Sequence, residues 1–152
     1  MEGKRAMRWW PIALVAAAAA CADYPRDIDG TLDRIRESRV LRVGATLAPD
    51  DVDLAQDYVS RLERATGARA TMSAGPAEQQ IALLEAGELD LVIGDFAEDS
   101  PWLTEVAVIE PLNERVVGDR MVGLAPVAAN GENRWIMLLE REVRNLRAGG
   151  KR

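Results

Sequence analysis

The chain has 152 residues and is acidic, with 25 Asp and Glu against 19 Lys and Arg, no histidine and one cysteine. This composition excludes an intramolecular disulfide, zinc sites of the Cys/His type, and Ser-His-Asp or Cys-His catalysis. The negative charge also argues against binding to nucleic-acid phosphates, because such binding depends on cationic side chains that release counterions.

The first twenty residues have the layout of a secretory signal. Three basic residues lie within the first eight, the uncharged run 9–20 follows, and small alanines precede Cys21. The run is too short to span a bilayer, which takes about 20 apolar residues. The approach to Cys21 resembles the lipobox of bacterial lipoproteins, although Ala18 stands where that motif usually carries leucine. The resemblance implies cleavage before Cys21 and acylation of its thiol. The alternative is an ordinary signal peptide that leaves a free cysteine.

We expect four segments along the chain: a signal peptide at 1–20, a polar tether at 21–30, one folded lobe at 31–147 and a short tail at 148–152. The length that remains after the signal suits one domain with a single core. Removal of the signal makes the chain more acidic, so its net charge does not favour attraction to anionic lipid.

Hydrophobic periodicity and turn residues divide the lobe into alternating helices and strands. The helices are expected at 32–38, where Thr31 can cap the start, and at 53–65, 76–86 and 132–146. The strands are expected at 40–45, 68–73, 89–94, 105–109 and 121–127. This order predicts an α/β fold, a single three-layer lobe around a mostly parallel sheet of about five strands.

In sheets of this kind, ligands bind beyond the carboxyl ends of the strands. The loops 46–51, 73–75 and 94–102 are therefore expected at one edge of the sheet. Carboxylates follow two of the strands, namely Asp50, Asp51, Asp95, Glu98 and Asp99. Together with the aromatic face of Trp102, they suit a cationic or amine-bearing ligand. Alternatively, the acidic residues only complement a helix dipole or are solvated, and Trp102 belongs to the core.

Several stretches together resemble the solute-binding proteins of ABC transporters, of the amino-acid type. They are residues 31–44 (TLDRIRESRVLRVG), 51–55, 83–94 (LLEAGELDLVIG), 106–112 and 125–143. The resemblance implies a periplasmic-binding-protein-like fold and a small-molecule ligand. Those receptors close two lobes around the ligand, whereas only one lobe is recognisable here. Trp102 stands where amino-acid receptors carry the arginine that grips the ligand carboxylate.

The predicted substrate-binding residues are Thr46, Asp50, Asp95, Phe96 and Trp102. The predicted function is that of an extracytoplasmic, lipid-anchored protein on the periplasmic or cell-surface side of a membrane. The prediction is that the protein recognises a small molecule, and one form of it adds that the molecule is delivered to an ABC transporter. The alternative is a membrane-tethered interaction module for a membrane-protein partner, without a ligand of its own. We expect no enzyme activity, cofactor, metal or nucleic-acid partner.

Overall fold

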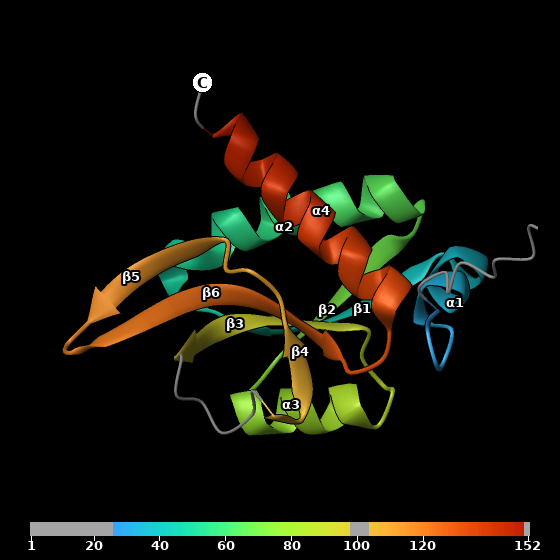
Figure 1. Ribbon diagram of the computed structural model, residues 1–152, viewed down its shortest axis with the longest axis horizontal. Helices are drawn as coiled ribbons and strands as arrows, with labels where there is room; N and C mark the ends of the chain where they lie inside the picture. Colours follow the sequence, from blue (N-terminus) through green and yellow to red (C-terminus); the bar gives the residue numbers. More distant parts are fainter. Residues whose placement is uncertain (1–25, 98–103, 151–152) are drawn as a thin grey trace, which may run out of the picture.

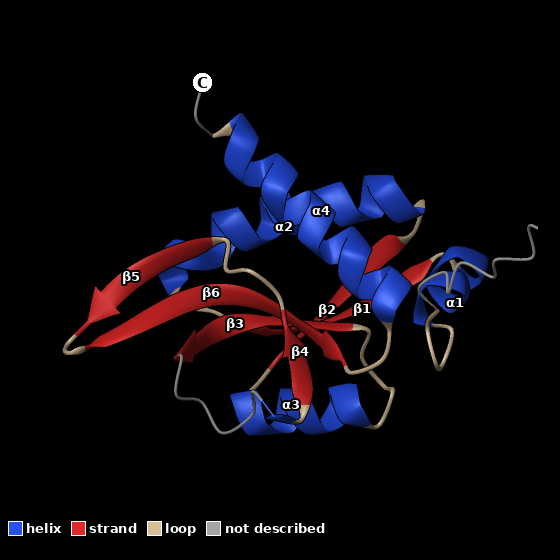
Figure 2. Ribbon diagram, in the orientation of Figure 1, coloured by secondary structure: helices blue, strands red, loops and turns tan. Residues whose placement is uncertain are grey.

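The computed structural model describes residues 26–97 and 104–150, so Cys21 and Trp102 lie outside the described residues. The helices are α1 (Thr31–Ser38), α2 (Val52–Thr66), α3 (Ala77–Glu85) and α4 (Asn133–Gly149), and the 3-10 turn η1 (Pro49–Asp51) precedes α2. The strands are β1 (Val40–Thr46), β2 (Arg69–Ala74), β3 (Leu91–Ala97), β4 (Val106–Val108), β5 (Asn113–Val117) and β6 (Arg120–Ala129). In the described part, six strands form one sheet with α1, α2 and α4 on one face and α3 on the other (Figure 1, Figure 2).

The α/β class and the single lobe are confirmed, and the sheet is mixed. The strand order is β2-β1-β3-β6-β4, and β5 also pairs with β6. β1 runs parallel to β2 and β3, whereas β6 runs antiparallel to β3, β4 and β5. The antiparallel half arises because short connections join β4, β5 and β6, and a parallel pairing needs a crossover of a dozen or more residues. The expectation of a mostly parallel sheet is corrected accordingly.

The core forms two clusters, one on each face of the sheet. The larger cluster lies beneath α1, α2 and α4, and Tyr58 and Trp135 are its largest fully buried side chains. The polar group of each side chain forms a hydrogen bond with a backbone carbonyl oxygen. The Tyr58 hydroxyl donates to the carbonyl oxygen of Leu139 at 3.0 Å, and the Trp135 indole N–H donates to that of Asp90 at 2.7 Å. Such pairing removes the penalty of burying these polar groups.

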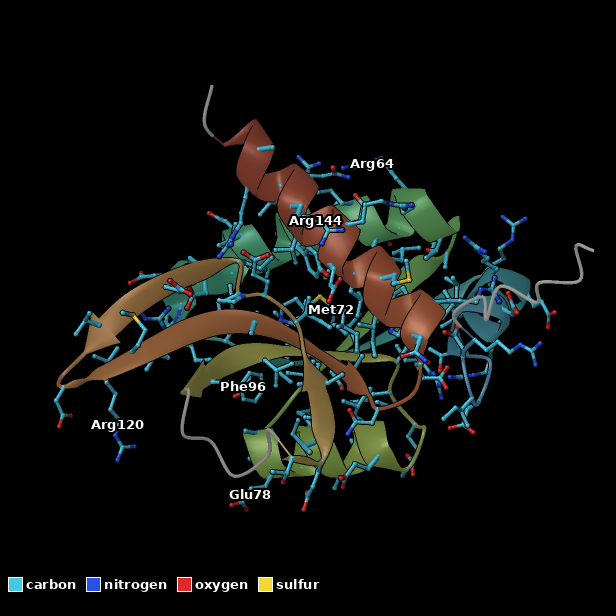
Figure 3. All side chains as sticks on the ribbon, viewed as in Figure 1. Arg64, Met72, Glu78, Phe96, Arg120 and Arg144 are labelled. Atoms are coloured by element: carbon cyan, nitrogen blue, oxygen red, sulfur yellow. The ribbon has the colours of Figure 1, made fainter. Side chains whose placement is uncertain are left out.

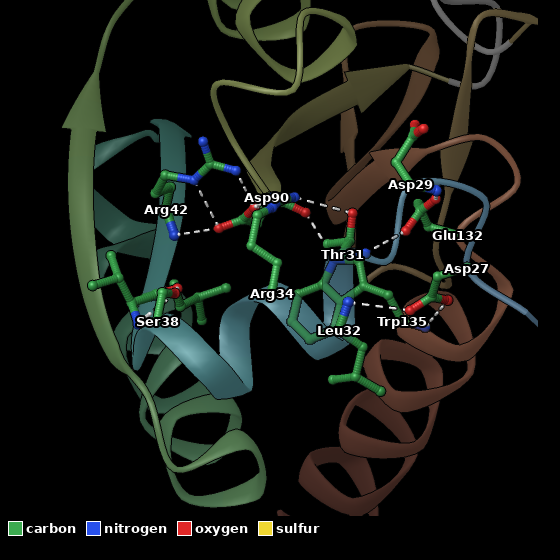
Figure 4. A network of polar contacts seen from close by, with 12 residues as sticks. Asp27, Asp29, Thr31, Leu32, Arg34, Ser38, Arg42, Asp90, Glu132 and Trp135 are labelled. Atoms are coloured by element: carbon green, nitrogen blue, oxygen red, sulfur yellow. Dashed lines mark hydrogen bonds and ion pairs between the residues drawn. The ribbon is translucent and has the colours of Figure 1, made fainter.

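The first and last helices are capped by acidic residues distant in the sequence (Figure 4). The buried carboxylate of Glu132 accepts the N–H groups of Asp29 and Thr31 at 2.6 and 2.8 Å, at the start of α1. Asp27 accepts from Leu32 in α1 and, through its other oxygen, from two N–H groups in the first turn of α4. The expectation that Thr31 caps α1 is wrong, since Thr31 is the first helical residue and the caps come from these carboxylates.

A buried carboxylate also organises the amino end of β3 (Figure 4). Asp90 is 2% exposed and accepts hydrogen bonds from the guanidinium groups of Arg34 and Arg42, at distances of 2.6 to 3.3 Å. It also accepts the backbone N–H of Arg42 at 2.8 Å. These hydrogen bonds raise the pKa of Arg42 above its ordinary value. Because Asp90 lies at the end of β3 opposite Asp95, we assign it to the stability of the lobe.

Candidate functional site

The carboxyl ends of the parallel strands β1, β2 and β3 lie side by side. Thr46 at the end of β1 pairs with Gly94 in β3, and Ala45 pairs with Ala74 at the end of β2. A side chain at Gly94 would collide with the γ-methyl group of Thr46, so glycine is needed for this close approach. The segments that follow β1 and β2 therefore start at one edge of the sheet, at which the carboxyl end of β3 also lies.

An ion cluster occupies this edge, formed by Asp51, Asp95, Asn113 and Arg115; we call it the Arg115 cluster. Arg115 on β5 places Nη1 2.9 Å from Oδ2 of Asp51 and Nη2 2.5 Å from Oδ2 of Asp95. The side-chain amide of Asn113 donates to Oδ1 of Asp51 at 3.1 Å. The cluster thus joins η1, β3 and β5 through their side chains.

The charges of the Arg115 cluster are not fully matched. Two carboxylates face one guanidinium, which leaves one negative charge in excess. The Asp51 side chain is 4% exposed, and that of Asp95 is 23% exposed. Oδ2 of Asp51 meets Arg115 as an ion pair without hydrogen-bond geometry, and the buried Oδ1 of Asp95 has no hydrogen-bond donor among residues 26–97 and 104–150. The hydrogen bond to Asp95, followed by the charges of Asp95 and Asp51, raises the pKa of Arg115, so its guanidinium stays charged.

The structure places the predicted site residues in different surroundings. Asp95 lies in the Arg115 cluster, half-buried Thr46 lies against Gly94, and Asp50 is exposed in η1. Phe96 is buried between β3 and α3, where it packs in the smaller core cluster (Figure 3). Successive strand residues face opposite sides of the sheet, so Phe96 and Asp95 point apart. This placement corrects the expectation that Phe96 lines the binding edge.

The predicted loop 73–75 is filled from within the protein. The side chain of Gln80 on α3 is 2% exposed and accepts a hydrogen bond from the Ser73 hydroxyl at 3.2 Å. Its amide lies so close to Gly44 and Gly75 that a Cβ atom at either glycine would collide with it. Gln80 therefore takes up the space at the ends of β1 and β2, and among the described residues the polar side chains of this edge that remain are those of the Arg115 cluster and Asp50.

Two residues of the cluster, Asn113 and Arg115, were absent from the sequence-based site because β5 was not expected. The available signal of a hairpin was the turn residue Gly118, whose φ in the structure is 67°. No group of three or more acidic, histidine or cysteine side chains among the described residues is arranged to hold a metal ion. Within residues 26–97 and 104–150, no helix has both the length and the apolar character needed to cross a bilayer.

No family model matches the sequence, and no curated protein matches it. Solved structures do match. Domain 1 of TmArgBP in its arginine-bound form gives a TM-score of 0.63 at 16% identity, over 74% of this chain and 98% of that domain. The chain has the fold of a solute-binding-protein lobe. The ancestral cationic amino acid solute-binding protein AncCDT-1 gives 0.63 at 11% identity, over 80% of this chain and 95% of that one.

A third solved structure, the substrate-binding protein of an amino acid ABC transporter, gives a TM-score of 0.56 at 10% identity, over 73% of this chain and 94% of that one. AncCDT-1 is also described as a precursor of cyclohexadienyl dehydratase. At these identities the likeness establishes the fold, while ligand and activity follow only from the side chains of this chain.

Proposed function

We propose that this protein is a solute-binding lobe that recognises a small cationic or amine-bearing molecule at the carboxyl ends of β1 and β3. The observation that carries the proposal is the pair of carboxylates, Asp51 and Asp95, that together hold a guanidinium group. A place that binds the Arg115 side chain has the charge and donor pattern for a free guanidinium or ammonium compound. The arginine-bound form of domain 1 from TmArgBP supports the idea, because that isolated lobe is similar along nearly its whole length.

Such a site works by charge complementarity on an open surface. Two carboxylates from different elements can each take one side of a planar guanidinium, which gives direction as well as attraction. An open half-site buries less of a ligand than a closed cleft, and pockets normally cover most of the ligand surface. Affinity is therefore expected to be weak unless a partner supplies the other wall.

The proposal includes a location. The signal layout and Cys21 support the proposal of a protein outside the cytoplasm that is held at a membrane by an acylated cysteine. An ABC transporter is the proposed recipient of the ligand, and the protein is proposed to act without catalysis or a cofactor. Anchoring raises the local concentration of a weak binder beside a membrane partner, so it offsets the modest affinity of an open site.

Binding is tested by calorimetric titration and thermal unfolding of the full-length chain carrying Cys21→Ser. We expect L-arginine, L-lysine or putrescine to raise the Tm in a concentration-dependent way, whereas glutamate and glucose leave it unchanged. Asp95→Asn should abolish the response, and Asp119→Asn, in the exposed hairpin turn, should preserve it. The proposal fails if no cationic compound binds at millimolar concentration.

A second function is favoured by one observation, an apolar tip on the β5–β6 hairpin. Val116, Val117 and Met121 are 68%, 53% and 43% exposed there, and the hairpin projects from the body of the lobe (Figure 1). Exposed apolar groups of this kind mark interaction surfaces. In this version the lobe is a membrane-tethered interaction module without a ligand. It predicts that no tested compound binds, and that Val116→Asp breaks a membrane-protein complex that Glu114→Gln leaves intact.

A further inference from the structure

The Arg115 side chain has the environment of a bound ligand. Its guanidinium bridges two carboxylates that belong to different elements, Asp51 in η1 and Asp95 in β3. Asp51 follows β1, and Asp95 lies near the carboxyl end of β3, so both belong to the proposed binding edge. Arg115 itself comes from β5 and reaches this edge only through its side chain. The position that an external cation needs is thus occupied by a cation of the same chain.

The contact can be released without unfolding the strand. The backbone of Arg115 pairs with Val122 in β6, and this pairing does not depend on where the guanidinium lies. The Arg115 side chain is 34% exposed, so it has a route to solvent. Its neighbours Glu114 and Val116 are exposed as well, so this part of β5 borders solvent.

The carboxylates are also incompletely satisfied by Arg115. Oδ1 of Asp95 is buried without a hydrogen-bond donor in the described part of the chain, and Oδ2 of Asp51 has an ion pair without hydrogen-bond geometry. A buried carboxylate oxygen without a donor costs free energy. A mobile ligand is free of the constraints of the β5 backbone, so it can orient its donors toward both oxygens.

We propose that Arg115 is a built-in competitor whose guanidinium fills the cation site until a ligand displaces it. This inference rests on the proposed function, and it makes Arg115 the residue that sets the apparent affinity for the cationic ligand. A site that is free in only a fraction of molecules shows an affinity reduced by that fraction. If Arg115 occupies the carboxylates in about nine molecules of ten, its removal tightens binding about tenfold.

A purely structural role for Arg115 makes a different prediction. An ion-pair staple between β5, η1 and β3 changes stability when it is removed and leaves ligand affinity as it was. A residue that contacts the ligand directly weakens binding when it is removed. Competition alone predicts tighter binding, so affinity in the Arg115 variant separates the three roles.

The experiment is calorimetric titration of L-arginine into three proteins: the full-length chain carrying Cys21→Ser, the same chain with Arg115→Gln, and a control with Arg120→Gln. Arg120 lies on the same hairpin and extends away from the body (Figure 3). We expect binding to tighten about tenfold in Arg115→Gln only. Adding Asp95→Asn to the Arg115→Gln chain should remove the gain.

Failure of the inference and failure of the proposed function give different results. Equal or weaker binding in Arg115→Gln overturns competition and leaves the proposed function standing. Absence of binding in every variant overturns both. Arg115→Lys keeps a cation on the hairpin and replaces Arg115→Gln if that variant does not fold. When both variants fold, Arg115→Lys should bind L-arginine more weakly than Arg115→Gln.

A second readout uses the protein with Arg115 in place. The Nε–H signal of Arg115 in a ¹⁵N spectrum, assigned from Arg115→Lys, reports directly on its guanidinium. Displacement predicts that this signal moves toward that of a solvated arginine as L-lysine is added, in proportion to occupancy. An unchanged signal under saturating ligand overturns the competition.

Discussion

The carboxylate of Glu132 accepts the backbone N–H of Thr31 at 2.8 Å, although the two residues are 101 positions apart in the chain. The same carboxylate accepts the N–H of Asp29, and Glu132 is only 1% exposed. An anionic cap at the start of a helix satisfies free N–H groups and complements the positive end of the dipole. Helix α1 is therefore held in place by a residue that directly precedes α4.

The first prediction concerns this cap. Glu132→Gln keeps the volume of the side chain but removes its charge and turns an amide donor toward N–H groups, so we expect the free energy of unfolding to fall by about 1–3 kcal/mol. Urea denaturation at neutral pH measures the change.

Glu140→Gln is the matched control for Glu132. Glu140 lies on α4 and forms a surface ion pair with Arg144, so its loss should cost less than about 0.5 kcal/mol. Equal effects of the two substitutions would show that Glu132 acts as an ordinary surface charge.

The second prediction is a loss of stability at high pH caused by Tyr58. Burial, and then the charge of Glu142, raises the pKa of Tyr58 well above its ordinary value. The unfolded chain releases the phenol proton near pH 10 while the folded chain retains it. The stabilisation is complete below about pH 10 and is lost as pH rises toward the folded pKa, by at most about 1.4 kcal/mol per pH unit.

Tyr58→Phe tests this linkage. The substitution removes the hydrogen bond to Leu139 and should cost about 1 kcal/mol at neutral pH. Because the variant has no phenol at this position, its free energy of unfolding should depend less on pH above about pH 10. Urea titrations at a series of alkaline pH values, together with phenolate absorbance, measure both effects. An unaltered pH dependence in Tyr58→Phe would contradict the prediction.

The third prediction concerns the close approach of β1 and β3. A Cβ atom at Gly94 would collide with the γ-methyl group of Thr46, so Gly94→Ala should lower stability by about 1–3 kcal/mol. Thr46→Ser removes this methyl group, and the double variant should recover part of the loss. A double-mutant cycle measured by thermal unfolding checks the coupling. Strictly additive effects would rule out a direct contact.

The fourth prediction concerns the proposed anchor. In cells that process lipoproteins, Cys21→Ser should move the protein from the membrane fraction to the soluble extracytoplasmic fraction and abolish palmitate labelling. Ala22→Ser, one position further, should keep both. Unchanged membrane association of the Cys21→Ser protein would remove the lipid anchor from the proposal.

The elements that could be predicted most accurately from the sequence are those that bury apolar side chains on one face and expose polar ones on the other. Residues 53–65 carry apolar side chains at helical spacing, and the structure has a helix at Val52–Thr66. The strand expected at 89–94 begins two residues later, at Leu91. Leu89 and Asp90 belong instead to the short connection between α3 and β3. Their N–H groups donate hydrogen bonds to the carbonyl oxygens of Leu83 and Arg42. Hydropathy alone does not separate such a buried turn from a strand.

Strand β5 escaped prediction because it lacks a hydrophobic face. Its stretch Asn113–Val117 leaves three of five residues exposed, and its two valines point to solvent at the hairpin tip. The Arg115 cluster was hidden for the same reason, since its cation reaches Asp51 and Asp95 only through the register of β5 on β6. Asp95 could be found because its place after an apolar strand is a local feature.

The central position of β6 determines when the chain can fold. β6 pairs with β3, β4 and β5, and α4 then adds Trp135, Leu139 and Val143 to the core that α1 and α2 begin. The early helices and strands therefore face water on one side until nearly the whole polypeptide has been synthesised. Because β6 and α4 come late in the chain, we expect the core to close only when synthesis is nearly complete, an order that fits the proposed export.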